Sequence, residues 1–152
     1  MANRVTTQDG KLPVLIVAPH GHKDNDFNTD IISDVLASEL RAYAVINVGW
    51  ARGPKAILGE NIANLNDIQH CRLGPCKREF LDPLVAIKDE IIAKHERCHI
   101  FYIHGMHNNV RTKVRDDVDI VMGYGQGDPP SHTCSLLYKN ALCTRLREEG
   151  FN

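Results

Sequence analysis

This sequence lacks the features that define several large classes of protein. No apolar run approaches the roughly 20 residues that a membrane-spanning helix needs. Its 18 basic and 19 acidic residues give a net charge of −1, without the basic excess usual in nucleic-acid-binding proteins. The first residues are polar and lack the charged-then-apolar order of a signal peptide. We therefore expect a globular protein with a small-molecule substrate and neither a nucleic acid nor a membrane as partner.

The cysteines also lack an arrangement that would indicate disulfides. There are 5 of them, an odd number, and none forms a C-x-x-C pair. This usage favours a reducing, cytoplasmic location over a disulfide framework. The 152 residues, 43% of them hydrophobic, can bury a core unaided and favour one domain over 1–152. Histidine, in contrast, is in excess, with 8 copies.

Apolar runs alternate along the chain with patterns of helical period. We expect apolar, buried-type strands at residues 13–18, 43–48 and 98–103, and a partly alternating strand at 118–122. We expect helices at residues 31–40 and 80–94, and a last one from a Ser131 cap to Gly150. The connection 49–75 is long and contains a candidate short helix near 61–68; such connections are functional or surface excursions. This order predicts an α/β fold, with a mostly parallel mixed sheet covered on both faces.

Two of the expected strands end in a His-Gly step. His20 follows the strand at 13–18, and His104 follows the strand at 98–103. Each glycine would let the backbone turn sharply. Ligands of open α/β sheets bind beyond the carboxyl ends of the strands, where both imidazoles would project. Two histidines, a carboxylate and an open position are the ligand set of a catalytic zinc site.

The carboxylate would come from the acidic loop with Asp24, Asp26 and Asp30. The alternative is that these aspartates form a solvated loop or a helix N-terminus, which favours negative charge. The histidines, likewise, could be hydrogen-bonded packing residues. His22 and His107 are near enough to be further ligands or acid–base groups.

Two other motifs are weaker. Gly123-x-Gly125-x-Gly127 before a helix suggests a phosphate cradle and hence a nucleotide-binding domain, although a substrate loop or plain turn fits better. Cys71 and Cys76, with His70, could bind a metal. Their spacing exceeds the commonest one for zinc ligands, so we favour reduced structural thiols.

A set of short motifs, in order along nearly the whole chain, resembles the N-formylglutamate amidohydrolase family. The matching stretches are Pro19-His20-Gly21, Asn28-Thr29-Asp30, residues 45–52, Asn64-Leu65-Asn66, residues 101–105, residues 119–123 and residues 142–151. The resemblance implies a phosphorylase/hydrolase-like α/β fold, related to zinc carboxypeptidases and aspartoacylase-type amidases. It also implies a zinc ion held by His20, an aspartate and His104. Asp30 matches the family's "TD" and is the first choice of aspartate; Asp26 is the second.

The resemblance further implies a zinc-dependent hydrolase of the amide bond in a small N-acylated amino acid such as N-formylglutamate. The metal would lower the pKa of its water and polarise the substrate carbonyl. Arg52 would pair with a substrate carboxylate, and Asn66 would donate a hydrogen bond. From the sequence alone, a surface ion pair explains Arg52 nearly as well.

The chain departs from the family pattern in two places. Asp67 stands where the family has an arginine, which argues against glutamate-type specificity unless Arg52 or Arg72 substitutes. The family also continues past the step at Phe151 to a glutamate that serves as general base in the related peptidases. No residue here matches it, so the chain is a fragment or a reduced member, and no catalytic base is assigned. The second hypothesis is therefore a catalytically inactive protein that keeps the fold and binds a small ligand or a partner.

Overall fold

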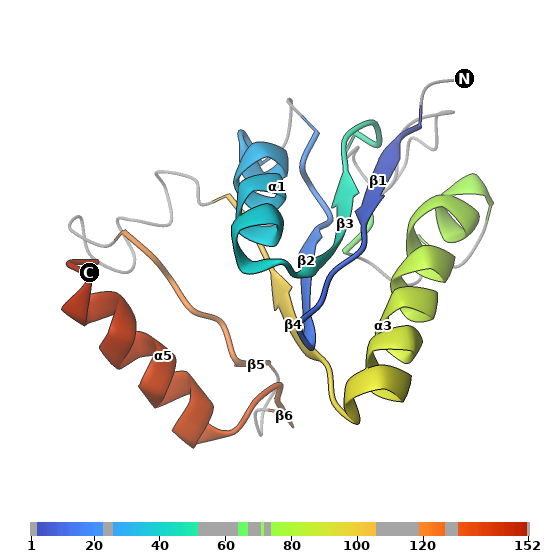
Figure 1. The fold of residues 1–152 in the computed structure, drawn as a ribbon. Coiled ribbons are helices and arrows are strands. Elements are labelled where there is room, and N and C mark those ends of the chain that lie inside the picture. Colours follow the sequence, from blue (N-terminus) through green and yellow to red (C-terminus); the bar gives the residue numbers. More distant parts are fainter. Residues whose placement is uncertain are drawn as a thin grey trace. The chain divides into compact units, whose positions relative to one another are not determined.

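The chain divides into two compact units, Met1–Gly105 and Met106–Asn152. The structure is a computed structural model and describes residues 3–22, 26–51, 64–66, 71, 74–105, 119–126 and 131–151 (Figure 1). In that part of the chain, no helix combines the length and the apolar character that crossing a membrane requires. All five cysteines are free thiols.

A four-stranded mixed sheet forms the centre of the first unit. The strands are β1 (Val5–Gln8), β2 (Val14–Ala18), β3 (Tyr43–Asn47) and β4 (His99–Tyr102), in the order β1-β3-β2-β4. β2 pairs in parallel with β3 and with β4, whereas β1 pairs antiparallel with β3. The expected strands at 13–18, 43–48 and 98–103 are thus confirmed, and β2 and β3 are unbroken apolar runs because they lie inside the sheet.

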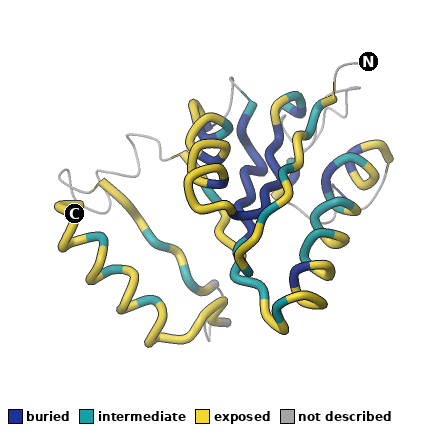
Figure 2. Tube along the Cα trace, viewed as in Figure 1, coloured by how far each residue is buried: buried dark blue, intermediate teal, exposed yellow. Residues whose placement is uncertain are grey.

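One helix covers each face of this sheet (Figures 1 and 2). Helix α1 (Thr29–Leu40) joins β2 to β3, and helix α3 (Asp82–His95), preceded by the π-helical turn η1 (Lys77–Leu81), lies between β3 and β4 in the chain. Successive side chains of a strand point to opposite faces. Leu15 and Val17 accordingly pack with Phe80 and Ile91, and their neighbours Ile16 and Ala18 pack with Ala37. The predicted α/β fold with both faces covered is confirmed at this level.

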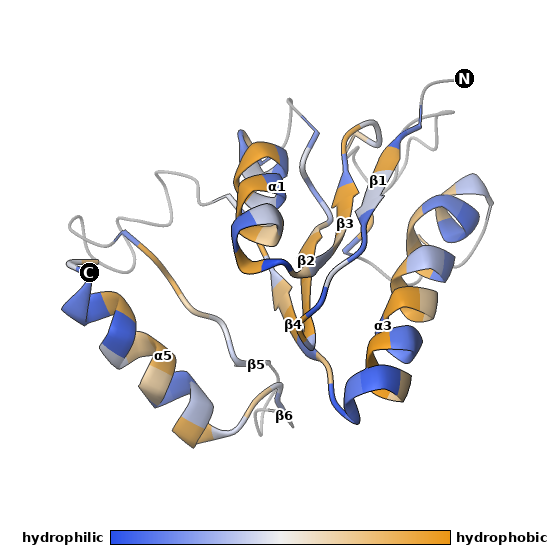
Figure 3. Cartoon of the chain, viewed as in Figure 1, coloured by the Kyte–Doolittle hydropathy of each residue, from blue (hydrophilic) through white to orange (hydrophobic). Residues whose placement is uncertain are grey.

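Helix α1 packs on the sheet through small residues. Thr29, Ser33 and Ala37, spaced four apart, are the buried positions of the helix. Its large aliphatic residues, such as Ile31 and Val35, are exposed, and Figure 3 shows the apolar colour along the helix. The helical pattern in the sequence therefore located the helix, but small side chains form its sheet-facing side because they let the backbone approach the strands closely.

The second unit contains a short hairpin and a helix. Strands β5 (Gly125–Gln126) and β6 (Ser131–His132) pair antiparallel, and helix α5 spans Leu136–Glu148. The expected strand at 118–122 is wrong where the structure describes it, because 119–122 have no regular secondary structure and Ile120 and Val121 are exposed.

The start of the last helix also differs from the prediction. Ser131 belongs to β6, and the cap is Ser135, whose hydroxyl accepts a hydrogen bond from the Tyr138 N–H. Gly125 lies in β5 and Gly127 lies outside the described residues, so the Gly-rich stretch does not lead directly into a helix N-terminus. The expected short helix near 61–68 also falls mostly outside the described residues. Within this range the structure describes 64–66, and residues 65 and 66 form a turn.

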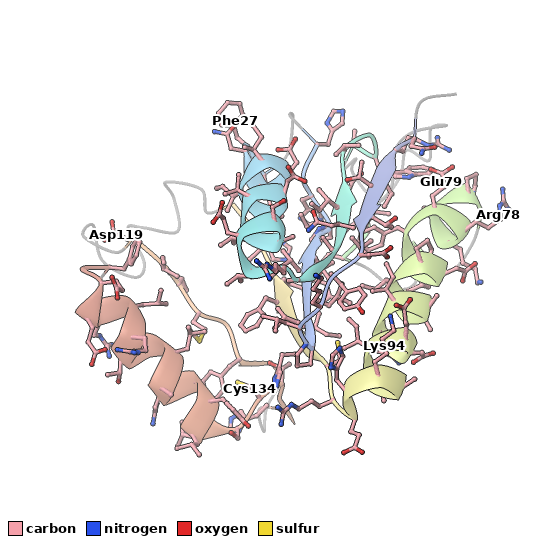
Figure 4. The ribbon with its side chains drawn as sticks, in the orientation of Figure 1. Phe27, Arg78, Glu79, Lys94, Asp119 and Cys134 are labelled. Carbon is pink, nitrogen blue, oxygen red and sulfur yellow. The ribbon has the colours of Figure 1, made fainter. Side chains whose placement is uncertain are left out.

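A charged and aromatic cluster fixes the outer strand β1 to the body of the first unit. Glu79, in η1, accepts two hydrogen bonds from the guanidinium of Arg4, which precedes β1 (Figure 4). The same guanidinium lies 4.0 Å from the centre of a Trp50 ring, and the indole N–H of Trp50 donates to Glu79 over 3.1 Å. Cation–π contact and charge-assisted hydrogen bonds thus join three separate segments.

Replacing Glu79 with glutamine is expected to lower the free energy of unfolding by about 1 kcal/mol at neutral pH. Glutamine is neutral and one of its two terminal groups is a donor, so it cannot replace both charge-assisted hydrogen bonds from Arg4. Urea denaturation measures the change. The matched control is Glu90→Gln on α3, which removes an exposed pair with Lys94 and should change the free energy of unfolding less than Glu79→Gln does.

This contribution also has a defined pH dependence. Hydrogen bonds from Arg4 hold the pKa of Glu79 below its ordinary value of 4.5. The stabilisation is complete above that value and is lost as the pH falls through the lower pKa of the folded state. The stability difference between Glu79→Gln and the parent protein should therefore shrink in acid. A difference that stays constant down to about pH 3 would contradict a role for the ionised carboxylate.

Candidate metal centre

The topology places the ends of β2 and β4 side by side at one edge of the sheet. From β2 the chain passes over one face through α1, and it reaches β4 after α3 on the other face. The strand order reverses at β2, with β3 on one side of it and β4 on the other, and such a reversal is a topological switch point, where α/β folds bind their ligands. His20 follows β2 and His104 follows β4, so both histidines lie at this point.

Three potential metal ligands converge there. His20, Asp26 and His104 each offer one ligand atom, and these atoms all lie within 4.8 Å of one another. A single carboxylate oxygen, Oδ2 of Asp26, lies 3.4 Å from Nδ1 of His20 and 3.1 Å from Nδ1 of His104. His20 and Asp26 are buried, whereas the side chain of His104 is 37% exposed. The group is therefore closed on one side and open to solvent on the other.

Asn64 determines which ring nitrogen of His20 carries the proton and which one faces this group. Nε2 of His20 lies 2.9 Å from Oδ1 of Asn64, and the same oxygen accepts the backbone N–H of Asn66 over 3.2 Å. Because this oxygen is an acceptor, Nε2 of His20 must carry the proton. A neutral His20 then turns the lone pair of Nδ1 toward Oδ2 of Asp26, which is also an acceptor. Two facing acceptors at this distance require a proton or a cation between them.

Two separations in the group are close to those of a small tetrahedral cation site. Zinc binds imidazole nitrogen and carboxylate oxygen at about 2.0–2.2 Å, so neighbouring ligands of a tetrahedral site lie about 3.4 Å apart. The two separations from Oδ2 of Asp26, 3.4 and 3.1 Å, are close to that value. Two histidines and one carboxylate leave a fourth position open, on the side where His104 is exposed. The donors suit zinc, and imidazole suits other transition metals as well.

Both glycines of the His-Gly steps serve close packing. A Cβ on Gly21 would lie 2.3 Å from the carbonyl oxygen of Asn47, and a Cβ on Gly105 would lie 3.0 Å from Cβ of Asp26. Neither glycine has a positive φ. The expected sharp turns are therefore not the reason for these glycines. They let the loop with Asp26 and the end of β3 approach the two histidines.

The buried residue Asn47 organises the strand ends beneath the group. Its amide nitrogen donates to the carbonyls of Pro19 and Trp50, at 2.9 and 2.8 Å. Its amide oxygen accepts the N–H groups of Gly49 and Trp50. All the hydrogen-bonding capacity of one side chain thus fixes the backbone just before His20 to the turn after β3.

Backbone hydrogen bonds hold Asp26, rather than Asp30, next to the histidines. The N–H of Asp26 donates to the carbonyl of His20, and the carbonyl of Asp26 accepts the N–H and the hydroxyl of Thr29. Asp30 lies in the first turn of α1, where negative charge is favourable, and is not in the group.

The other predicted residues lie apart from the group or outside the described residues. Asn66 is exposed and contacts the group only through its N–H bond to Asn64. His22 is described but is not one of the converging ligands. Asp24, Arg52, Asp67, His70, Arg72 and His107 lie outside the described residues.

Sequence reasoning did not assign roles to Asn47 and Asn64. Asn47 ends an apolar strand, and a polar residue at the carboxyl end of a buried strand was a usable signal. No feature of the sequence pairs Asn64 with His20. Comparisons of the chain with protein-family models, with curated proteins and with solved structures found no match.

Zinc titration of aspartate variants tests which carboxylate completes the group. Asp26→Asn is expected to weaken zinc binding at least 100-fold, because it removes one of three protein ligands. Asp30→Asn, four residues away, is the matched control and should leave the affinity unchanged. Competition with a chromophoric chelator measures both. Equal loss in the two variants would contradict the assignment of Asp26.

A second pair of variants tests the hydrogen bond behind His20. Asn64→Ala is expected to weaken zinc binding about 10–100-fold, because the imidazole loses the acceptor that orients it. Asn66→Ala keeps its backbone N–H and should retain the parent affinity. In the metal-free protein, NMR of the imidazole nitrogens should find His20 protonated at Nε2 in the parent and in Asn66→Ala, and should find a smaller share of that tautomer in Asn64→Ala. An unchanged tautomer in Asn64→Ala would contradict the role of Asn64.

Proposed function

We propose that this chain is a zinc-dependent amidohydrolase that cleaves the amide bond of a small N-acylated amino acid. The observation that carries the proposal is the convergence of His20, Asp26 and His104 at the switch point of the sheet. The motifs that resemble the N-formylglutamate amidohydrolases support the same reaction class and suggest an N-formyl amino acid as substrate. They also support a three-layer, phosphorylase/hydrolase-like fold as the finer description of the α/β architecture.

The three residues of the group would hold a metal from different sides. His20 and Asp26 are buried and would hold the metal on its inner side, while the exposed His104 would hold it beside the open position. A bound zinc ion supplies Lewis acidity toward an amide carbonyl and toward water. Asn64 keeps the Nδ1 lone pair of His20 directed at the site by accepting the Nε2 proton.

A second function is supported by the composition of the group. Within the described residues, Asp26 is the only carboxylate among the converging ligands, so no described residue is assigned as the general base. A protein that holds a metal and a small ligand without hydrolysing it would need no such base. Under this alternative, zinc and ligand binding persist and turnover is absent.

Hydrolysis of N-formyl amino acids by the zinc-loaded protein tests the proposal. Formate release should depend on zinc, stop on chelation, and return when zinc is restored. Asp26→Asn should lower kcat/KM at least 100-fold, whereas Asp30→Asn should retain it. Formate release that survives both chelation and Asp26→Asn would overturn the proposal. Tight zinc binding without release from any N-formyl amino acid would favour the non-catalytic alternative.

A further inference from the structure

A small apolar pocket lies beside the candidate metal centre in the first unit. Its volume is about 100 Å³, and its walls include Leu65, Cys71, Phe80 and Leu84, with Asn66 and Tyr102 also lining it. Leu65, Cys71 and Phe80 are almost completely buried, whereas Asn66 and Tyr102 are exposed. The pocket therefore has an apolar floor and a partly polar rim.

Two short connections place the rim of this pocket next to the metal ligands. Tyr102 comes two residues before His104 at the end of β4, which corresponds to about 6.6 Å along an extended strand. Asn66 donates its N–H to Oδ1 of Asn64, the oxygen that also holds Nε2 of His20. A molecule held at the metal could therefore extend a side chain into the pocket.

The described walls of the pocket carry no charge at neutral pH. None of the described residues that line it is acidic or basic. Burial, reinforced by the neighbouring Cys76, raises the pKa of Cys71 to about 12, so its thiol stays protonated. A carboxylate placed here would lose water without gaining a charged partner from these walls.

The volume limits what can enter. Whole small-molecule sites usually measure about 300–1,000 Å³, and an apolar cavity of about 150 Å³ is enough to hold benzene. A pocket of about 100 Å³ is thus too small for a complete substrate but suits a branched aliphatic group of about four carbons.

We propose that this pocket binds the side chain of the substrate, and that the preferred substrate is an N-acyl amino acid with an aliphatic side chain such as leucine. The inference rests on the proposed amidohydrolase function and deepens it. It departs from the family resemblance, which points to glutamate, because the described residues of the pocket walls offer apolar contact and include no cation for a side-chain carboxylate.

The zinc-loaded protein should hydrolyse N-formyl-leucine with a kcat/KM about 10- to 100-fold above that for N-formyl-glutamate, as expected for burial of one aliphatic side chain. Leu84→Phe fills the pocket and should remove most of this preference. Val85→Phe adds the same bulk at the next residue of α3, which is 43% exposed and does not line the pocket, and should retain the preference.

Binding of non-hydrolysable ligands separates failure of the pocket from failure of the enzyme. Calorimetry should show that zinc-loaded protein binds N-acetyl-leucine more tightly than N-acetyl-glutamate, and that Leu84→Phe but not Val85→Phe weakens the binding of N-acetyl-leucine. This binding pattern without hydrolysis would support the role of the pocket in binding the side chain and refute the amidohydrolase function. Preference for the glutamate derivative, equal effects of the two variants, or no binding of either ligand would overturn the inference. Circular dichroism confirms that both variants fold; if Leu84→Phe does not, Leu84→Ala serves, because it removes apolar contact with the leucine side chain and should also weaken binding of N-acetyl-leucine, with Val85→Ala as its control.

Discussion

Parallel pairing of β2 on both of its edges is the constraint from which the rest of the first unit follows. Parallel neighbours cannot be joined by a tight hairpin, so each needs a crossover that packs on a face of the sheet. Helix α1 occupies one face and α3 the other. Both faces of β2 are then buried, which requires an unbroken run of apolar residues. The carboxyl end of β2 lies beside the carboxyl end of β4. The candidate metal centre lies at these strand ends because α1 and α3 connect the strands over opposite faces of the sheet.

Polar groups that collect at this edge must balance one another because little water reaches them. Asp26 is nearly buried, and a buried carboxylate is costly unless it is paired. The two imidazoles face it, and the side-chain amides of Asn47 and Asn64 satisfy the backbone and ring groups around them. Nδ1 of His20 and Nδ1 of His104 both face Oδ2 of Asp26, at 3.4 and 3.1 Å. Chemistry at this edge therefore centres on one carboxylate oxygen.

Much of the fold could be predicted because local patterns and tertiary burial agree in the central strands. The run at 13–18 became β2, and the run at 98–103 became β4. β1 was not foreseen because its sequence, VTTQ, has no apolar face, and it is stabilised by pairing with β3 and by the cluster of Arg4, Trp50 and Glu79. The apolar run at 118–122 showed the opposite: without a neighbouring strand in the described residues, its apolar character did not make it a strand.

The sequence by itself determined the secondary structure of the first unit's interior and the placement of His20 and His104 at strand ends, because both depend on the order of residues along a short segment. Only the tertiary structure decided which carboxylate joins them. Asp26 and Asp30 both follow His20 and lie four residues apart in the sequence, but the hydrogen bond from Asp26 to the His20 carbonyl turns one inward and the first turn of α1 holds the other away. It also decided that Asn64 orients His20 and that Leu84 and Tyr102 line a pocket, since contacts across 44 or 18 residues depend on the packing of α3 and β4 and leave no local pattern.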